Sequence, residues 1–201
     1  MRLVVATRNE HKLRELEEIL AGIELVPLPP DVELPPEDGE TFDDNASIKA
    51  RAARAATGGA AIADDSGIEA RALGGAPGVR SARYAGPDAT DEQNLDKLLR
   101  EVAAAGDDRR VAYVCALVHV DDVGVERTFW GRCEGRLAAE PRGKGGFGYD
   151  PAFVPDATGP GDDRTMAELE PVVKHAISHR GRAARALADA LGVEAPTGAE
   201  R

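Results

Sequence analysis

Apolar and polar positions along the chain alternate first with the spacing of a strand and then with that of a helix. A short apolar run over Leu3–Ala6 predicts a buried strand. Apolar residues then recur at helical spacing from Leu13 to Leu20, and Gly22 is a typical helix stop. A second short strand is expected over residues 23–26. The chain therefore opens with a strand, a helix and a strand.

The rest of the chain continues this alternation. Helices are expected over 46–56, 91–105 and 171–191, and strands over 60–63, 111–120, 125–130 and 151–154. Residues 67–72 are expected to pair back on the preceding strand as a hairpin. Strands that alternate with helices are typical of the α/β class.

Length favours one compact domain. A chain of 201 residues is long enough for one sizeable core and short for two independent ones. No internal repeat and no clean domain linker divides the sequence. We therefore expect a single domain over 1–193, built of two lobes, followed by a flexible tail over 194–201.

Charge and cysteine content narrow the classes of partner. The 36 acidic residues outnumber the 25 basic ones, which gives a formal net charge of −11. This excess disfavours nucleic acid as a partner and leaves room for a small phosphorylated ligand with a metal and a few local cations. Cys115 and Cys133 have neither metal-site spacing nor the density of a disulfide scaffold. Without a signal peptide or a membrane span of about 18 apolar residues, we expect a cytoplasmic protein with no membrane partner.

The apolar run that begins at Ala60 ends in Asp64, Asp65, Ser66 and Gly67. Asp, Ser and Gly are residues that turns prefer, so a surface turn is one interpretation. A strand that delivers two adjacent carboxylates into a turn is also a plausible site for a metal and a general base. Carboxylate oxygens suit Mg²⁺, which fills its other positions with water and phosphate oxygens.

The segment from Thr7 to Lys12 lies where the first strand turns into the first helix. Amides at a helix N-terminus favour phosphate, and this turn adds a hydroxyl, an amide and a cation. The segment matches neither a P-loop nor a dinucleotide fingerprint. An ordinary helix cap is the alternative interpretation.

Two loops offer further candidates. Glu37 stands in a proline-rich acidic loop over 27–40, which is irregular and could simply be solvated. The glycine-rich loop over 142–150 contains Phe147 and Tyr149, whose rings could stack on a base, and it ends at Asp150. A mobile connector is the alternative for this second loop.

The last predicted helix contains Lys174, His175, His179 and Arg180. The two histidines have the spacing of a zinc pair, but the glutamate of the zinc-protease motif is missing and no third ligand is evident. We therefore interpret Lys174 and Arg180 as oxygen or phosphate contacts, with solvated helix charges as the alternative.

Six short motifs, in order along the chain, resemble the inosine/xanthosine triphosphate pyrophosphatase family. Each is weak alone, and the ordered set is specific. They are Thr7-x-Asn9-x-x-Lys12, Thr41-Phe42-x-x-Asn45-Ala46, Ile62 to Gly67, Leu73 to Tyr84, Gly145 to Pro151, and Ser178-His179-Arg180.

This resemblance implies a Mg²⁺-dependent hydrolase that cuts ITP, dITP and XTP to the monophosphate and pyrophosphate. It also implies a homodimer. The expected fold is α/β, an elongated twisted mixed β-sheet flanked by helices, with two lobes and a central active-site cleft. Two other hypotheses about the function stay open. The protein could be a related pyrophosphatase that acts on modified pyrimidine nucleotides, or a nucleotide-binding regulatory module without turnover.

The resemblance also implies roles for particular residues. Asp65 would be the general base, and Glu37 and Asp65 would hold the metal. Arg180 or a backbone N–H would read the purine O6, which accepts a hydrogen bond in hypoxanthine, whereas adenine presents a donor there. The residues expected to bind substrate are Thr7, Arg8, Asn9, Glu10, His11, Lys12, Ser66, Phe147, Gly148, Tyr149, Asp150, Lys174, His179 and Arg180.

Overall fold

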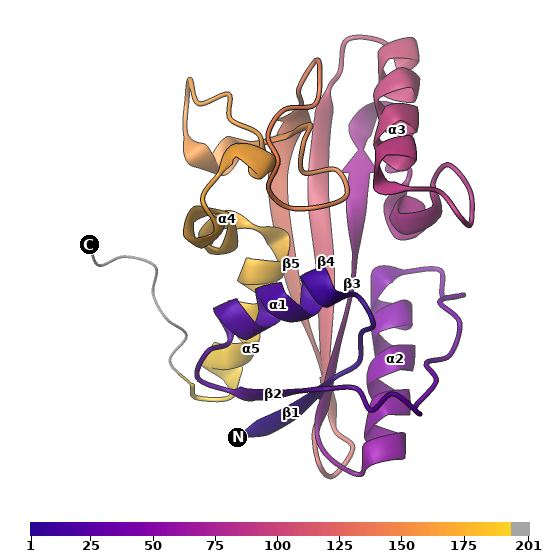
Figure 1. Ribbon diagram of the computed structural model, residues 1–201, viewed down its shortest axis with the longest axis vertical. Coiled ribbons are helices and arrows are strands. Elements are labelled where there is room, and N and C mark those ends of the chain that lie inside the picture. The colour runs from indigo at the N-terminus through magenta and orange to yellow at the C-terminus, as the bar shows by residue number, and fades with distance from the viewer. Residues whose placement is uncertain (194–201) are drawn as a thin grey trace. The chain divides into compact units, whose positions relative to one another are not determined.

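A computed structural model describes residues 1–193 of the protein (Figure 1). Its contacts divide the chain into two compact units. Among the described residues, the first unit comprises Met1–Asp65, Cys115–Gly131 and residues 180–193, and the second comprises Ser66–Val114 and Arg132–His179. The single domain over 1–193 and the cleft between lobes stay predictions, and the tail over 194–201 lies outside the described residues.

The strands form one mixed sheet with the order β2-β1-β3-β4-β5-β6. β1 is parallel to both β2 and β3, whereas β5 and β6 are antiparallel. The mixed sheet with helices confirms the predicted α/β class. The strands are β1 (Arg2–Val5), β2 (Glu24–Pro27), β3 (Ala61–Ala70), β4 (Arg110–Val120), β5 (Glu126–Leu137) and β6 (Phe153–Pro155).

The first unit contains α1 (Glu10–Ile19), α2 (Phe42–Thr57) and α5 (His179–Ala190). The first residue of α5, His179, is assigned to the second unit. Leu16 of α1 and Leu187 of α5 are fully buried in one core with residues of β1, β3 and β4. Thr41 caps the start of α2, because Thr41 and Asp44 form a reciprocal capping box. The helix ends at Gly58, whose left-handed φ of 71° suits glycine.

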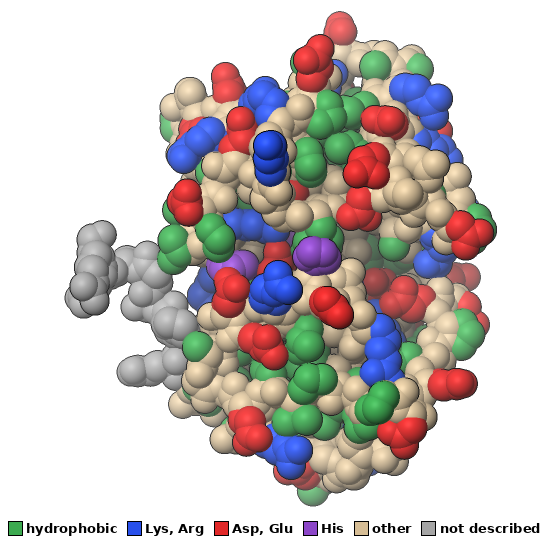
Figure 2. All heavy atoms as spheres, in the orientation of Figure 1, with side chains coloured by type: hydrophobic (Ala, Val, Ile, Leu, Met, Phe, Trp, Pro, Cys, Tyr) green, Lys and Arg blue, Asp and Glu red, His purple; other side chains and the backbone are tan. Residues whose placement is uncertain are grey.

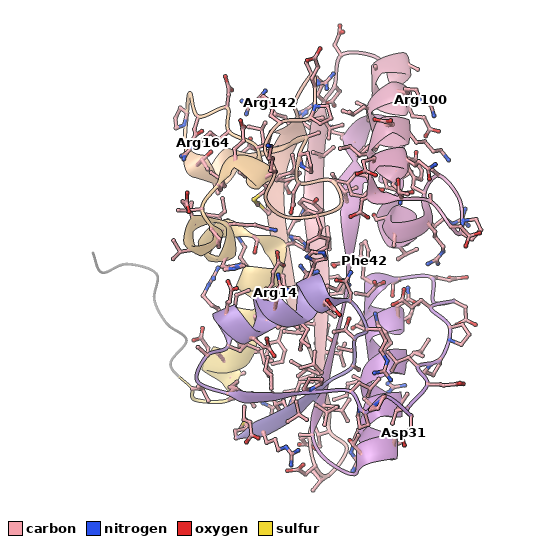
Figure 3. All side chains as sticks on the ribbon, in the orientation of Figure 1. Arg14, Asp31, Phe42, Arg100, Arg142 and Arg164 are labelled. Carbon is pink, nitrogen blue, oxygen red and sulfur yellow. The ribbon has the colours of Figure 1, made fainter. Side chains whose placement is uncertain are left out.

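The second unit contains α3 (Asp91–Ala105) and α4 (Pro171–Ile177). Its core gathers aromatic and aliphatic side chains, among them Tyr113, Phe153 and Leu98. Arg142, at the start of the glycine-rich loop, donates to the main-chain oxygen of Asp163 (Figure 3). This contact ties the loop to the segment that follows β6.

The structure corrects the prediction that a turn follows Asp65. Asp64 and Asp65 lie in the middle of β3, which continues without a break to Ala70. β3 is hydrogen-bonded to β1 on one side and to β4 on the other. Because residues 67–70 continue β3 in the same direction, the chain does not reverse there, and the predicted hairpin over 67–72 is wrong.

The long helix predicted over 171–191 is also wrong as a single element. Ser178 adopts an extended conformation, with φ −65° and ψ 157°, and ends α4 before α5 begins. Serine hydrogen-bonds readily to nearby backbone and therefore favours helix ends over helix interiors. Apolar spacing continues across Ser178, which is why the sequence pattern missed the break.

Across the described residues, no helix has both the length and the apolar character that a membrane crossing requires.

Both cysteines are buried and neither forms a disulfide. Burial, together with the negative charge of Asp64, raises the pKa of the Cys115 thiol to about 12. Because the thiolate is the reactive form, neither cysteine should react with iodoacetamide in the native protein at pH 8. Both should react after unfolding in urea, which mass spectrometry would detect. Rapid modification of the native protein would contradict this burial.

Candidate functional site

The turn between β1 and α1 is built by the side chains of Thr7 and Asn9. Asn9 Oδ1 accepts hydrogen bonds from the backbone N–H groups of His11 (2.9 Å) and Lys12 (3.1 Å). Thr7 Oγ1 accepts from the N–H of Asn9 at 3.1 Å. The ordinary helix cap is therefore present. Phosphate contact by this segment stays a prediction, and it would depend on side chains such as Lys12.

Arg8 is directed toward the proline-rich loop. Its guanidinium donates to the carbonyl oxygens of Leu28 (2.9 Å), Pro29 (2.7 Å) and Val32 (2.6 Å). In this structure Arg8 therefore anchors the loop that carries Glu37. Glu10 and His11 are exposed on the first turn of α1. Substrate contact by these three side chains stays a prediction.

Asp64 is a buried carboxylate surrounded by cations. Its Oδ2 accepts from Arg180 Nε (3.1 Å) and Nη2 (2.9 Å), and Lys12 Nζ lies 3.2 Å away. Lys49 Nζ donates to the main-chain oxygen of Asp64 at 2.8 Å. Burial alone would raise the pKa of the Asp64 carboxyl, but the charges of Lys12, Arg180 and Lys49 outweigh it and hold that pKa well below its usual range. Asp64 is therefore ionised at neutral pH.

Arg180 joins two buried acids. Its Nη1 donates to Glu15 Oε2 on α1, while Nε and Nη2 bind Asp64 on β3. The side chain is only 2% exposed. Arg180 therefore holds α5 against α1 and β3, and its predicted contact with the purine base stays a prediction. Sequence reasoning missed Glu15 because a single glutamate on a charged helix has no distinguishing pattern.

Asp65 lies in a different environment from its neighbour. Its Oδ2 accepts from Asn45 Nδ2 at 3.0 Å. Burial raises the pKa of the Asp65 carboxyl and the charge of Glu37 adds to this, against the opposing effects of Lys12 and Lys49. A carboxylate with a raised pKa is suited to accept a proton. This arrangement fits the predicted general base.

Glu37 is half-buried and bound to Lys49. The ammonium group of Lys49 donates to Glu37 Oε1, and Asn45 Oδ1 accepts from the N–H of Gly39 at 2.9 Å. Both Asn45 and Lys49 are buried on α2. Asn45 belongs to one of the six motifs, whereas Lys49 was not predicted from the sequence, although a lysine spaced with the buried alanines of a helix is a usable signal.

The acidic groups of the first unit fit Mg²⁺ chemically. The charge of Glu37 raises the pKa of Asp65, so the two carboxylates lie within electrostatic range, and a divalent cation would relieve their repulsion. In the part of the chain described here, no group of three or more His, Cys, Asp or Glu side chains has the arrangement of a metal site. That Glu37 and Asp65 hold Mg²⁺, together with the water and substrate oxygens that this ion prefers, stays a prediction.

In the second unit, Asp150 closes the glycine-rich loop. Asp150 Oδ2 accepts from the N–H of Phe147 (3.0 Å) and from Lys174 Nζ (2.7 Å). Its Oδ1 accepts from the Tyr113 hydroxyl at 3.1 Å. The loop is also held from α3, since Asp91 Oδ2 accepts from the N–H of Gly148 at 2.7 Å. The loop is therefore bonded at several points, contrary to a mobile connector.

The aromatic residues of this loop differ in exposure. Tyr149 is 5% exposed, belongs to the core of the second unit, and donates to the main-chain oxygen of Ser81 at 2.7 Å. Phe147 is half-buried, and Lys174 Nζ lies 5.3 Å from the centre of its ring. Of the two rings predicted to stack on a base, Phe147 is therefore the more accessible.

The predicted site residues divide between the two units. Residues 7–12, Glu37, Asp65 and Arg180 belong to the first, and Ser66, residues 147–150, Lys174 and His179 to the second. Two peptide bonds, Asp65–Ser66 and His179–Arg180, join these groups along the chain. On the face shown in Figure 2, acidic and basic side chains are interspersed.

Comparison with known proteins identifies close relatives. A model described as the Ham1 family matches residues 3–190. The chain is 51% identical to a dITP/XTP pyrophosphatase of Cutibacterium acnes, over 94% of this chain and 96% of that protein. It is 50% identical to a dITP/XTP pyrophosphatase of Mycobacterium tuberculosis, over 94% of this chain and 95% of that protein.

Solved structures agree with this result. A HAM1 protein from Coxiella burnetii has a TM-score of 0.86 and 42% identity, over 96% of this chain and 98% of that one. A nucleoside-triphosphatase / dITP/XTP pyrophosphatase from Mycobacterium abscessus has a TM-score of 0.73 and 46% identity, over 93% of this chain and 98% of that one.

The contacts of Arg180 predict a large structural effect of its removal. Arg180→Leu would leave the carboxylates of Asp64 and Glu15 buried without this cation, which should lower the free energy of unfolding by about 3–5 kcal/mol. Urea unfolding would measure the change. The matched control is Arg14→Leu, an exposed position on α1 of the same unit, where we expect a change within about 0.5 kcal/mol. A loss at Arg180 below about 1 kcal/mol, typical of a surface pair, would contradict the account.

Proposed function

The chain belongs to the Ham1 family, and from this membership we propose that it hydrolyses non-standard purine nucleoside triphosphates, namely dITP, ITP and XTP. The products are the nucleoside monophosphate and pyrophosphate. The family match confirms the resemblance predicted from the six motifs. The function would remove deaminated purine nucleotides before polymerases use them.

The adjacent carboxylates Asp64 and Asp65 are the observation that carries this proposal. Asp64 is ion-paired with Lys12 and Arg180, whereas Asp65 is held by the neutral amide of Asn45 and has a raised pKa. In our proposal, Asp65 takes a proton from the water whose oxygen attacks the α-phosphorus. The bond from that phosphorus to the bridging oxygen breaks, and pyrophosphate leaves.

Cations of the first unit supply the charge that a triphosphate requires. Lys12 and Lys49 both lie at the carboxylate pair, and their positive charges lower the pKa of Asp65 against the effect of burial. In our proposal these lysines also bind phosphate oxygens, with Thr7 and Asn9 shaping the turn that presents Lys12. Mg²⁺, held by Glu37 and Asp65, would neutralise phosphate charge and favour attack by water.

The second unit would recognise the base. Phe147 would stack on the purine ring, and polar groups around Gly148, Lys174 and His179 would read its edge. A purine O6 that accepts a hydrogen bond would be favoured over the amino group of adenine, which would leave a donor in the site unpaired.

We also propose that the enzyme is a cytoplasmic homodimer that binds neither nucleic acid nor membrane.

The proposal predicts the products as well as the substrates. With Mg²⁺, the protein should convert ITP to IMP and pyrophosphate, and it should turn over ATP at least about 10²-fold less efficiently. Chromatography of the nucleotides and an assay that separates pyrophosphate from orthophosphate would test both points. Orthophosphate as the product, or equal turnover of ATP, would refute the assignment. A preference for dUTP or methylated bases would favour a pyrimidine enzyme.

Asp65→Asn should abolish turnover and leave the fold intact. Asparagine preserves the shape of the side chain but cannot accept the proton, so kcat should fall by about 10²–10⁴-fold. The control is Asp31→Asn, an exposed aspartate of the same unit (Figure 3). Circular dichroism would check the fold of both variants. A kcat of Asp65→Asn equal to that of the wild type would exclude Asp65 as the base. If the wild-type protein itself binds nucleotide without turning it over, it is a regulatory module.

A further inference from the structure

Tyr113 of β4 contacts two of the residues expected to recognise the base. Its hydroxyl donates to Asp150 Oδ1 at 3.1 Å. Its ring stacks on the imidazole of His179, with centroids 4.5 Å apart and planes 6° from parallel. Phe153 packs against the same ring at 4.6 Å. One buried side chain, 7% exposed, therefore holds a loop residue and the residue at the start of α5.

The carboxylate of Asp150 determines the shape of the glycine-rich loop. Its Oδ2 lies so close to the backbone of the loop that a Cβ added at Gly146 would be only 2.1 Å from this oxygen. Gly146 also has a φ of 71°, which side-chain-bearing residues rarely adopt. The same oxygen accepts from the N–H of Phe147 and from Lys174. Tyr113 binds the other oxygen, so its hydroxyl restrains the orientation of the whole carboxylate.

We propose that Tyr113 is a positioning residue that sets the base selectivity of the enzyme, an inference that rests on the proposed function. It acts through Asp150, which fixes Phe147 and Lys174, and through His179. Discrimination by hydrogen bonding requires that donors keep a fixed position, because a donor that can shift is able to accommodate either O6 or an amino group. Loss of the Tyr113 hydroxyl therefore relaxes selectivity more than it slows chemistry.

Tyr113→Phe tests this role because it removes one oxygen and keeps the stacked ring. The matched control is Tyr84→Phe, since the Tyr84 hydroxyl also donates to a carboxylate of the second unit, that of Glu101. We expect the ratio of kcat/KM for ITP to kcat/KM for ATP to fall about tenfold or more in Tyr113→Phe. In Tyr84→Phe the ratio should stay within about twofold of wild type.

A second measurement separates selectivity from general damage. Calorimetric titration of IMP and of AMP should show that Tyr113→Phe narrows the affinity difference between the two products, whereas a merely structural effect would weaken both equally. Tyr113→Leu, which also removes the stack on His179, should narrow the difference further. An unchanged ITP to ATP ratio in folded Tyr113→Phe, or an equal loss in Tyr84→Phe, would overturn the inference. Failure of the wild-type protein to prefer ITP would instead refute the proposed function.

Discussion

The burial of one charge, that of Asp64, is the constraint on which the first unit depends. A carboxylate 1% exposed is stable only when cations and hydrogen bonds compensate its lost hydration. The compensation comes from Lys12 on α1, Lys49 on α2 and Arg180 on α5. Three helices from distant parts of the chain are therefore tied to the centre of β3. The same cations form the positive environment that a triphosphate needs.

The geometry of a strand explains why two adjacent aspartates differ. Successive side chains of a strand point to opposite faces, so Asp64 meets Arg180 whereas Asp65 meets Asn45 of α2. One carboxylate is held ionised by direct ion pairs, and the pKa of the other is raised by burial. The first is thereby a structural anchor and the second is suited to proton transfer. In the second unit, Asp150 likewise organises a loop through its hydrogen bonds.

Local sequence patterns were enough to predict much of this protein, and long-range contacts account for the rest. The opening strand, helix and strand follow from the apolar spacing of nearby residues. The turn expected after Asp65 was wrong because β3, which is hydrogen-bonded to β4, continues through Asp65 to Ala70, and composition does not reveal this long-range pairing. The role of Arg180 as a link between Asp64 and Glu15 depends on residues 116 and 165 positions away.

The unfolding free energies of Asp64→Asn and Asp65→Asn, measured side by side in urea at pH 7, test this account most directly. Asp64→Asn should lose about 3–5 kcal/mol, because it leaves buried cations without their carboxylate. Burial raises the pKa of Asp65 above its unfolded value, so its ionised form costs stability as pH rises through the folded pKa. Asp65→Asn should therefore match or exceed the wild type in stability. Equal losses in the two variants, or a larger loss at Asp65, would contradict the division of roles between the two carboxylates.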